Sequence, residues 1–310
     1  MDVKQLRALV TVAEVGSVTR AAALLHLVQP AVTRQIRALE HELGVALFER
    51  TRQGMLPTEA GVIMADRARR ALGELERGRS EVRPAAGAVT GTVTVGLLDS
   101  ASDLLAGPLA SRLALSHPGV ELRLVTAYSG HLRQWLDEGR LDLSLLYDLH
   151  GTASLTTRPL VSERLWAVAP PTERLPLGHP VPFAELARHP LVLPMPGHAL
   201  RSLIDTAAAR AGVSLTVAVQ SDSMRVQKHL VLAGHGWTVL PGVCVTRDIA
   251  DQELRAAPLC RPVVRRSVVL ATPGPTRTTP AADAVAKALV SAVTTSVRQG
   301  DWPSAPVRGG

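Results

Sequence analysis

Residues 27 to 44, LVQPAVTRQIRALEHELG, combine hydrogen-bonding and apolar side chains at helical spacing. One stripe of this segment is apolar and consists of Val32, Ile36, Leu39 and Leu43. A second stripe carries a hydroxyl and two guanidinium groups that can donate hydrogen bonds, and it consists of Pro30, Thr33, Arg34 and Arg37. Proline is tolerated in the first helical turn, so we expect the helix to begin at Gln29 or Pro30 and to end at Gly44. An ordinary amphipathic helix with a solvated polar face shows the same pattern, so the neighbouring elements have to distinguish the two interpretations.

The elements around this segment follow a helix-turn-helix pattern. Apolar residues at helical spacing indicate a first helix before Gly16, and Ser17 or Thr19 caps a second short helix. Two short helices, a tight turn and a helix with one apolar and one polar face are typical of domains that place the last helix in the DNA major groove. Residues 46–58 then contain two extended runs around a turn, which predicts a wing.

The composition is that of a globular protein with more than one domain. The chain has 310 residues, of which 46% are hydrophobic and 20% are charged. The most apolar stretch, residues 230–245, is interrupted by glycine and proline, and the first residues do not resemble a signal peptide. Only two cysteines are present, Cys244 and Cys260, too few for a disulfide scaffold. We therefore expect a cytoplasmic protein that does not span a membrane.

The charge of the chain favours a polyanionic partner only weakly. The net charge is +7, but residues 1–56 contain seven basic and five acidic residues, so the excess is not concentrated there. The local arrangement is more informative. No acidic residue lies between Val15 and Leu39, and this stretch contains Arg20, Arg34 and Arg37.

A long helix is expected to follow the wing, from an N-cap at Thr58 through about residue 82. Small and apolar residues recur there at alternating spacings of three and four, which predicts a coiled-coil-like seam: Gly61, Met64, Ala68, Ala71, Leu75, Gly78 and Val82. The preferred interpretation is pairing with a second copy of the chain. The alternative is packing of the helix along its own domain.

The remaining chain alternates between strands and helices. Residues 84–91, PAAGAVTG, are linker-like, and a strand-helix-strand-helix-strand pattern follows up to about residue 148. A second unit continues from there, and the segments around residues 265–273 and 280–297 are expected to cross back and complete the first unit. The fold class is therefore α/β overall, with a parallel sheet in the first unit. The tail, residues 299–310, is expected to be disordered.

An enzyme is the main alternative from a different functional class. The sequence contains no GxxxxGK[ST], HExxH, GxSxG or paired CxxC motif, and the segment TVGLLDS lacks the glycines of a dinucleotide site. We expect no catalytic residue, no metal and no cofactor. A ligand-independent architectural DNA-binding protein is a further alternative, but it would not need the α/β region of residues 91–298.

Several spaced motifs of the N-terminal segment resemble those of LysR-type transcriptional regulators. They include Gly-Ser before an Ala-Ala helix, Gln-Pro-Ala before Thr-Arg-Gln-Ile, Leu-Glu-x-x-Leu-Gly and Leu-Phe-x-Arg, all within residues 1–65, and the AGHGWTVLP segment downstream is also similar. Residues 25–36 and 196–212 look closer to the branch that includes nitrogen-assimilation control proteins. Two positions depart from the family pattern, Val18 and Val28. A valine at position 28 has no hydroxyl group for capping or for a phosphate contact.

The resemblance implies a division of the chain into three parts and a tail. A winged helix-turn-helix domain occupies residues 1–58, and a linker helix with a hinge occupies residues 59–90. An effector-binding domain resembling periplasmic binding proteins occupies residues 91–298, with lobe I formed by residues 91–162 and 268–298 and lobe II by residues 163–267. The implied partners are double-stranded DNA, a small-molecule effector, RNA polymerase, and further copies of the chain as a homodimer through the linker helix and a homotetramer.

The resemblance also implies how the polar face of residues 29–37 meets DNA. Gln29 and Arg34 can each make two hydrogen bonds to a base edge, and Ala31 or the Thr33 methyl can touch a thymine methyl group. Phosphate contacts are expected from Arg37, Arg20 and the Thr33 hydroxyl. Arg50 or Arg52 is expected in the flanking minor groove. The complete predicted DNA-binding set is Arg20, Gln29, Pro30, Ala31, Thr33, Arg34, Arg37, Arg50 and Arg52.

The effector is expected in the cleft between the lobes, because ligands of parallel sheets bind beyond the carboxyl ends of the strands. This places candidate ligand contacts at the ends of several strands: Ser100, Ala101, Ser102, Ser129, Gly130, Gly197, His198, Arg201, Ser221 and Asp222. Serine-rich helix starts suit the carboxylate that is the usual effector class of the family. Asp99 and Asp222 argue against a simple anion site, because a carboxylate repels another.

Overall fold

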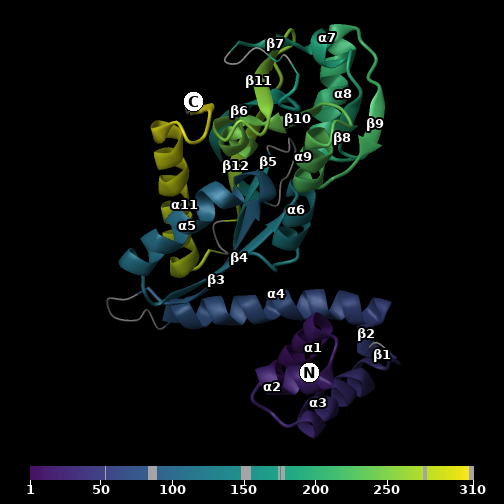
Figure 1. The fold of residues 1–310 in the computed structure, drawn as a ribbon. Coiled ribbons are helices and arrows are strands. Elements are labelled where there is room, and N and C mark those ends of the chain that lie inside the picture. The colour runs from purple at the N-terminus through teal and green to yellow at the C-terminus, as the bar shows by residue number, and fades with distance from the viewer. Residues whose placement is uncertain are drawn as a thin grey trace.

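The structure is a computed structural model, and it describes residues 1–52, 54–82, 89–147, 155–173, 175, 179–274 and 278–306. Figure 1 shows a small helical domain at the N-terminus, one long helix, and a larger α/β domain on the other side of that helix. The predicted hinge lies largely outside the described residues, as do Gln53 in the wing and residues 307–310.

The N-terminal domain contains three helices and a two-stranded wing. The elements are α1 (Val3–Val15), α2 (Val18–Leu24), α3 (Gln29–Leu43), β1 (Phe48–Thr51) and β2 (Gly54–Pro57). Helix α2 is capped by Ser17, whose hydroxyl accepts a hydrogen bond from the Arg20 amide at 3.4 Å. Helix α3 begins at Gln29 and ends at Gly44, whose φ of 69° favours glycine. The antiparallel strands β1 and β2 form the predicted wing, so the local predictions for this domain are confirmed.

The long helix α4 (Glu59–Val82) begins beside Thr58, whose hydroxyl accepts a hydrogen bond from the Gly61 amide at 3.0 Å. The predicted seam does not face a second copy along its first half, and that part of the prediction is wrong. Ala68 is buried in the core of the N-terminal domain, and a Cβ at Gly61 would overlap the carbonyl oxygen of Leu47. The small residues let α4 pack closely against its own domain, which it contacts at α1 and, at Gly61, at Leu47 and Pro57. Leu75, further along, is exposed.

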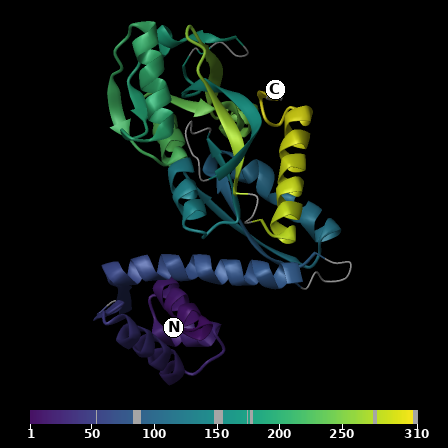
Figure 2. The ribbon, with the colours of Figure 1, turned by 180° about the vertical axis from the view of Figure 1, so that it is seen from behind.

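The first lobe of the α/β domain has the predicted parallel arrangement. Its three parallel strands are β3 (Gly91–Leu98), β4 (Val120–Ala127) and β5 (Leu143–Tyr147). They are connected by α5 (Asp99–Ser116) and α6 (Ser129–Asp137). Helix α11 (Pro280–Gln299) returns from the end of the chain and packs on α5 and β3, as Figure 2 shows from behind, so the predicted return of the chain is confirmed.

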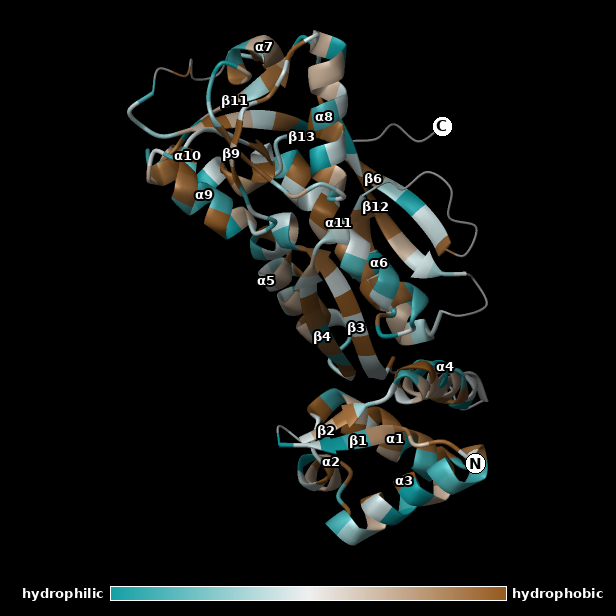
Figure 3. Ribbon diagram, turned by 90° about the vertical axis from the view of Figure 1, so that its right-hand side faces the viewer, coloured by the Kyte–Doolittle hydropathy of each residue, from teal (hydrophilic) through white to brown (hydrophobic). Residues whose placement is uncertain are grey.

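Two long antiparallel strands, β6 (Leu155–Ala169) and β12 (Arg265–Pro273), connect the first lobe to the second. The main sheet runs in the order β4-β3-β5-β12-β6-β11-β7, and β10 and β13 also pair with β6. Figure 3 shows that the strands carry many hydrophobic residues, which form the main core of the first lobe. The second lobe has a core of its own.

The second lobe consists of short elements. Its strands are β7 (Val181–Pro182), β8 (Leu191–Leu193), β9 (Val217–Gln220), β10 (Thr238–Pro241) and β11 (Arg255–Cys260). Its helices are α7 (Phe183–Leu186), α8 (Ala199–Ala211), α9 (Met224–Leu232), the 3₁₀ helix η1 (Gly242–Cys244) and α10 (Thr246–Ala250). Strands β8 and β9 are parallel, so their carboxyl ends point the same way.

The prediction of a disordered tail is wrong for the part of the tail that the structure describes. Strand β13 (Ser304–Pro306) pairs with β6, and the Trp302 side chain is 1% exposed in the core of the first lobe. The Gly and Pro content of the tail suggested disorder, whereas burial of a single indole can stabilise a short segment by several kcal/mol, about 3–5.

Candidate functional site

Helix α3 is fixed to its own domain through its apolar stripe. Val32, Ile36 and Leu39 are buried in the core that α1, α2 and α4 also supply. Leu43, the fourth residue of the apolar stripe, is 39% exposed. It lies in the last helical turn, beyond the part of α3 that this core covers. Three residues over two turns therefore hold the helix.

The opposite face of α3 carries the predicted polar groups. Gln29, Pro30, Arg34 and Arg37 are exposed, and Ala31 and Thr33 are half-buried. None of the polar side chains in this set has a hydrogen bond or ion pair within the described part of the chain. Figure 1 shows α3 at the edge of the domain that faces away from α4.

Three arginines flank α3. Arg20, in α2, is exposed and donates a hydrogen bond from Nη2 to the Val15 carbonyl oxygen at 2.5 Å. Arg50 and Arg52 are exposed in the wing, on β1 and directly after it. Helix α3 and the wing therefore belong to the same small domain, and the basic side chains of both are accessible to solvent.

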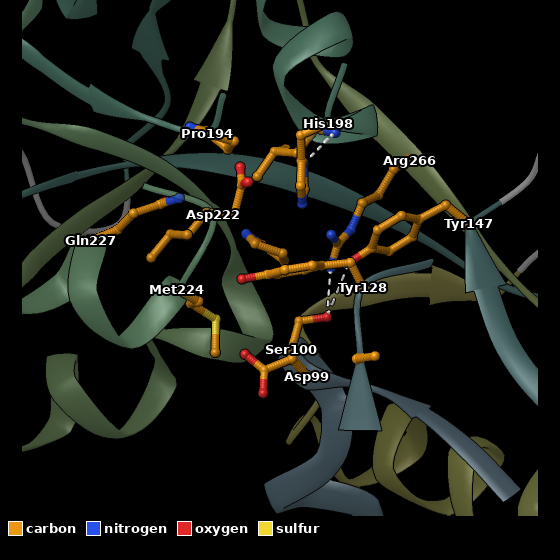
Figure 4. A pocket seen from close by; sticks show the side chains of 14 residues that line it. Asp99, Ser100, Tyr128, Tyr147, Pro194, His198, Asp222, Met224, Gln227 and Arg266 are labelled. Carbon is orange, nitrogen blue, oxygen red and sulfur yellow. Dashed lines mark hydrogen bonds between the residues drawn. The ribbon is translucent and has the colours of Figure 1, made fainter. Parts of the chain in front are cut away.

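A pocket of about 410 Å³, including its open mouth, lies between the two lobes. In Figure 4 its walls come from strand ends of both lobes. The first lobe contributes Asp99 and Ser100 after β3, Tyr128 after β4 and Tyr147 from β5. The second lobe contributes the remaining walls from the segments after β8 and β9 and from β10, with Pro194, His198, Leu200, Asp222, Met224, Gln227 and Leu240.

The floor of this pocket is a buried charged cluster. Arg266, on β12, donates from Nε to Glu163 at 2.5 Å, and the two side chains are 3% and 0% exposed. Its Nη2 donates to the Ser100 hydroxyl at 3.0 Å, and its guanidinium lies 4.1 Å from the Tyr147 ring centroid. Trp302 donates from Nε1 to the other oxygen of Glu163 at 2.9 Å. The guanidinium is therefore fixed, and its charge is balanced inside the protein.

The electrostatics of the pocket disfavour a charged histidine. Burial lowers the pKa of His198; the Asp222 carboxylate opposes this shift, and the Arg266 guanidinium adds to it. Burial also raises the pKa of the Tyr128 phenol, and the charges of Asp222 and Asp99 raise it further. Both shifts favour the neutral forms of His198 and Tyr128.

Two family models match the chain. The model described as "Bacterial regulatory helix-turn-helix protein, lysR family" matches residues 3–62, and the model "LysR substrate binding domain" matches residues 86–294. The chain belongs to the LysR family of transcriptional regulators. It is a DNA-binding regulator with an effector-binding domain, and its relatives are named as regulators rather than enzymes.

Full-length relatives support the assignment to the LysR family. The regulator BbuR of Bordetella bronchiseptica is 32% identical over 306 residues, covering 99% of this chain and 94% of the relative. The nitrogen assimilation regulatory protein nac of Klebsiella aerogenes is 31% identical and covers 78% of each chain. The closer subgrouping with nitrogen-assimilation regulators stays a prediction.

Solved structures share the whole fold. Full-length OxyR from Pseudomonas aeruginosa matches with a TM-score of 0.75 at 24% identity, over 94% of both chains. CbnR in complex with its target DNA matches with a TM-score of 0.67 at 22% identity, over 96% of this chain and 100% of that chain. The predicted fold, a winged helix-turn-helix followed by a two-lobed α/β domain, is confirmed.

Six of the predicted effector contacts of this LysR regulator do line the cleft. Ser100, His198 and Asp222 line the inner pocket. Ser129, Gly130 and Gly197 line an outer hollow of about 1050 Å³ that shares Tyr128, Tyr147, His198 and Asp222 with the inner pocket. Ser129 is itself buried, and its hydroxyl accepts a hydrogen bond from the Tyr147 amide at 2.9 Å.

The other four predicted contacts line neither the inner pocket nor the outer hollow. Helix α5 begins at Asp99; Ala101 lies in the core, and the Ser102 hydroxyl donates to the Asp99 carbonyl oxygen. Arg201 is held by Asp205 at 2.9 Å and by the Pro194 carbonyl oxygen at 3.0 Å. The Ser221 hydroxyl accepts a hydrogen bond from the Ser223 amide at 3.3 Å.

Sequence reasoning missed the floor of the pocket. Arg266 and Glu163 occupy facing strands, and Tyr147 ends a third. A charged side chain within the apolar strand pattern RRSVVLATP was the available signal for Arg266. Nothing local marked Glu163 as its partner. In the described part of the chain no cluster of three metal-ligating side chains is present, and no helix is long and apolar enough to cross a bilayer.

Proposed function

We propose that this regulator recognises a dyad-symmetric operator by inserting the polar face of α3 into the major groove. Gln29 and Arg34 are assigned to base edges, with Ala31 or the Thr33 methyl against a thymine methyl group. Arg37, Arg20 and the Thr33 hydroxyl are assigned to phosphates. The observation that carries the proposal is the set of hydrogen-bond donors on α3 that have no partner in the described chain and face away from the rest of the protein.

The wing extends this interface. Arg50 and Arg52 are exposed on β1 and directly after it, and we assign one of them to the minor groove beside the α3 site. A narrow A·T-rich groove has a more negative potential and therefore favours a guanidinium there. The DNA sequence between the half-sites then contributes to affinity through its shape.

The cleft between the lobes is proposed as the effector site, with inner contacts from Ser100, His198 and Asp222 and outer contacts from Ser129, Gly130 and Gly197. A ligand that contacts both lobes stabilises one lobe arrangement over others, and this shifts the geometry of the DNA-bound assembly. A ligand-independent architectural protein would not need such a pocket. The regulator would act in the cytoplasm and contact RNA polymerase at its target promoters.

Peroxide sensing is a second candidate, because several relatives at 28–29% identity are named hydrogen peroxide-inducible genes activators. Such chemistry needs a reactive thiolate. Burial raises the pKa of the Cys244 thiol, which disfavours the thiolate, and the thiol instead donates a long hydrogen bond to the Ser100 carbonyl oxygen at 3.6 Å. Small-molecule binding in the cleft is therefore the better supported function.

Replacing Arg34 by alanine is expected to weaken binding to the operator by about 1–3 kcal/mol and to relax base preference, because one bidentate base contact is lost. Arg20→Ala is expected to weaken operator and random DNA alike and to reduce the salt dependence. Gel shifts on the upstream DNA and on a scrambled duplex, at several salt concentrations, measure both effects.

The matched control is Arg188→Ala, which removes an exposed arginine from the effector domain and is expected to leave both affinities unchanged. An equal loss on operator and scrambled DNA for the Arg34 variant would contradict its assignment to a base. Failure of the folded wild-type protein to retard any duplex would overturn the DNA-binding proposal itself.

We assign the dimer contact to α4, with tetramers formed through the effector domains. Large apolar side chains remain exposed on the described part of this helix, namely Val62, Ile63 and Leu75. Ile63→Glu is expected to weaken dimerisation by about tenfold or more, because an unpaired carboxylate resists burial. Sedimentation velocity over a concentration series measures this. Val263→Glu, at another exposed valine, is the control, and equal dimerisation of both variants would exclude α4 as the contact.

A further inference from the structure

The inner pocket presents one donor that the protein leaves unused. Arg266 uses Nε for Glu163 and Nη2 for Ser100, while Nη1 has no hydrogen-bond partner among the described residues. Figure 4 shows the guanidinium facing into the pocket between His198 and Ser100. The Arg266 side chain is only 3% exposed, so water can satisfy Nη1 only poorly. A ligand acceptor at Nη1 would therefore gain a hydrogen bond at little cost in lost hydration.

Carboxylates form another part of the same pocket. Asp222 follows β9 and Asp99 follows β3, and both line the cavity. One oxygen of Asp222 accepts a hydrogen bond from the Met195 amide at 2.9 Å, which fixes the side chain. Neither carboxylate has an ion-pair partner within 4 Å in the described residues. The pocket thus carries negative charge that no protein cation neutralises.

Neutral and apolar groups lie between the Arg266 guanidinium and the Asp222 carboxylate. Arg266, His198 and Asp222 line the same pocket, so one small molecule can reach both the guanidinium and the carboxylate. The Tyr128 ring lies edge-on to the His198 ring, with centroids 5.1 Å apart. Leu200, Met224 and Leu240 supply apolar parts of the remaining walls, and Gln227 supplies a polar part.

We propose that the inner pocket binds a small zwitterion, an α-amino acid with an apolar side chain. Its carboxylate accepts hydrogen bonds from Arg266 Nη1 and the Ser100 hydroxyl, and its ammonium group lies against Asp222, which Figure 4 shows on the opposite side of the pocket from Asp99. Its side chain packs on the apolar walls. This inference rests on the proposed role of the cleft as the effector site, and it narrows the ligand class expected from the family resemblance.

Each half of such a ligand alone fits less well. A simple carboxylate would meet a guanidinium whose charge Glu163 already balances, and it would lie near two unneutralised carboxylates. A simple amine would neutralise carboxylate charge in the pocket. It has no acceptor for the Arg266 Nη1 donor, which would stay without a hydrogen bond. Only a molecule with both charges pairs both regions of the pocket.

Matched probe series test the inference in the full-length protein. Each series contains an amino acid, its deaminated acid and its decarboxylated amine: L-leucine with 4-methylpentanoate and 3-methylbutylamine, and corresponding sets for L-methionine and L-phenylalanine. Isothermal titration calorimetry without DNA measures affinity. We expect at least one amino acid to bind about tenfold or more tightly than both of its analogues. Equal binding of an analogue in every series, or no binding by any of the three amino acids, would overturn the inference.

The carboxylate contact is tested separately with Asp222→Asn, which keeps an oxygen for the Met195 amide but removes the charge. This variant is expected to bind the amino acid about tenfold more weakly and to bind the deaminated acid at least as well as the wild type does. Asp251→Asn, in an exposed turn, is the matched control and should change neither affinity. If Asp222→Asn and Asp251→Asn change the affinity for the amino acid equally, the assignment of Asp222 to the ammonium group is contradicted.

The ligand inference and the proposed function can fail independently. An amino acid that binds with the expected selectivity but leaves the operator footprint unchanged would support the ligand class and contradict the effector role of the cleft. A protein that binds its operator but none of the amino acids would retain its DNA-binding function and lose the ligand inference.

Discussion

Replacing Glu163 by glutamine is expected to destabilise the effector domain by about 3–5 kcal/mol. The glutamine removes the charge that balances Arg266 in an environment where both side chains are almost completely buried. A guanidinium left unpaired there cannot recover its hydration, and the Trp302 indole keeps only a neutral acceptor. Because a domain of this size is stabilised by only about 5–15 kcal/mol, most of its stability is at risk.

Chemical unfolding followed by tryptophan fluorescence measures this loss, because Trp302 reports on the same cluster. The control is Glu185→Gln, which removes the same charge from an exposed pair with Arg188 at 3.2 Å. An exposed pair contributes about 0–1 kcal/mol, so this variant is expected to unfold almost like the wild type. Equal and small losses in the two variants would contradict the structural role assigned to the buried cluster.

Replacing Leu39 by alanine is expected to destabilise the N-terminal domain by about 2–5 kcal/mol and to abolish operator binding. Leu39 is fully buried where α3 packs against its own domain, and removing its branched end leaves a cavity. Small domains have little stability in reserve, so α3 loses its fixed position even though every polar side chain on its other face is intact. Gel shifts and circular dichroism measure the two effects.

Leu43→Ala is the matched control for this experiment. It makes the same substitution one turn later in the same helix, where the side chain is exposed rather than buried. A surface substitution of this kind changes stability by about 0.5 kcal/mol or less, so operator binding is expected to persist. Loss of binding in the Leu43 variant with a folded domain would show that the last turn of α3 also contacts DNA.

The N-terminal domain could be predicted almost completely from the sequence. Its helices begin and end at local signals such as Ser17, Gly16 and Gly44, and the apolar stripe of α3 gives the buried face directly. Leu43 belongs to the same stripe but is exposed, because periodicity gives the direction of a side chain but not how far along the helix the core extends.

The long helix shows where the same reasoning fails. Gly61 and Ala68 belong to a regular pattern of small residues, and the pattern correctly indicated close packing. It did not indicate the partner, which is the helix's own domain for the first half of α4. A stripe of small residues has the same appearance in the sequence whether the neighbouring surface belongs to the same chain or to another copy.

The amino-acid sequence alone determined the family, the order of the domains and the helix that faces DNA, because these follow from motifs and periodicities that a few neighbouring residues define. Only the tertiary structure decided what the effector cleft contains. Glu163 meets Arg266 across 103 residues of chain, Arg266 meets Ser100 across 166, and Trp302 reaches Glu163 from a tail whose composition indicated disorder. Strand order and register bring these side chains together, and no local pattern encodes them, so the arrangement of charged groups in the cleft follows from the fold.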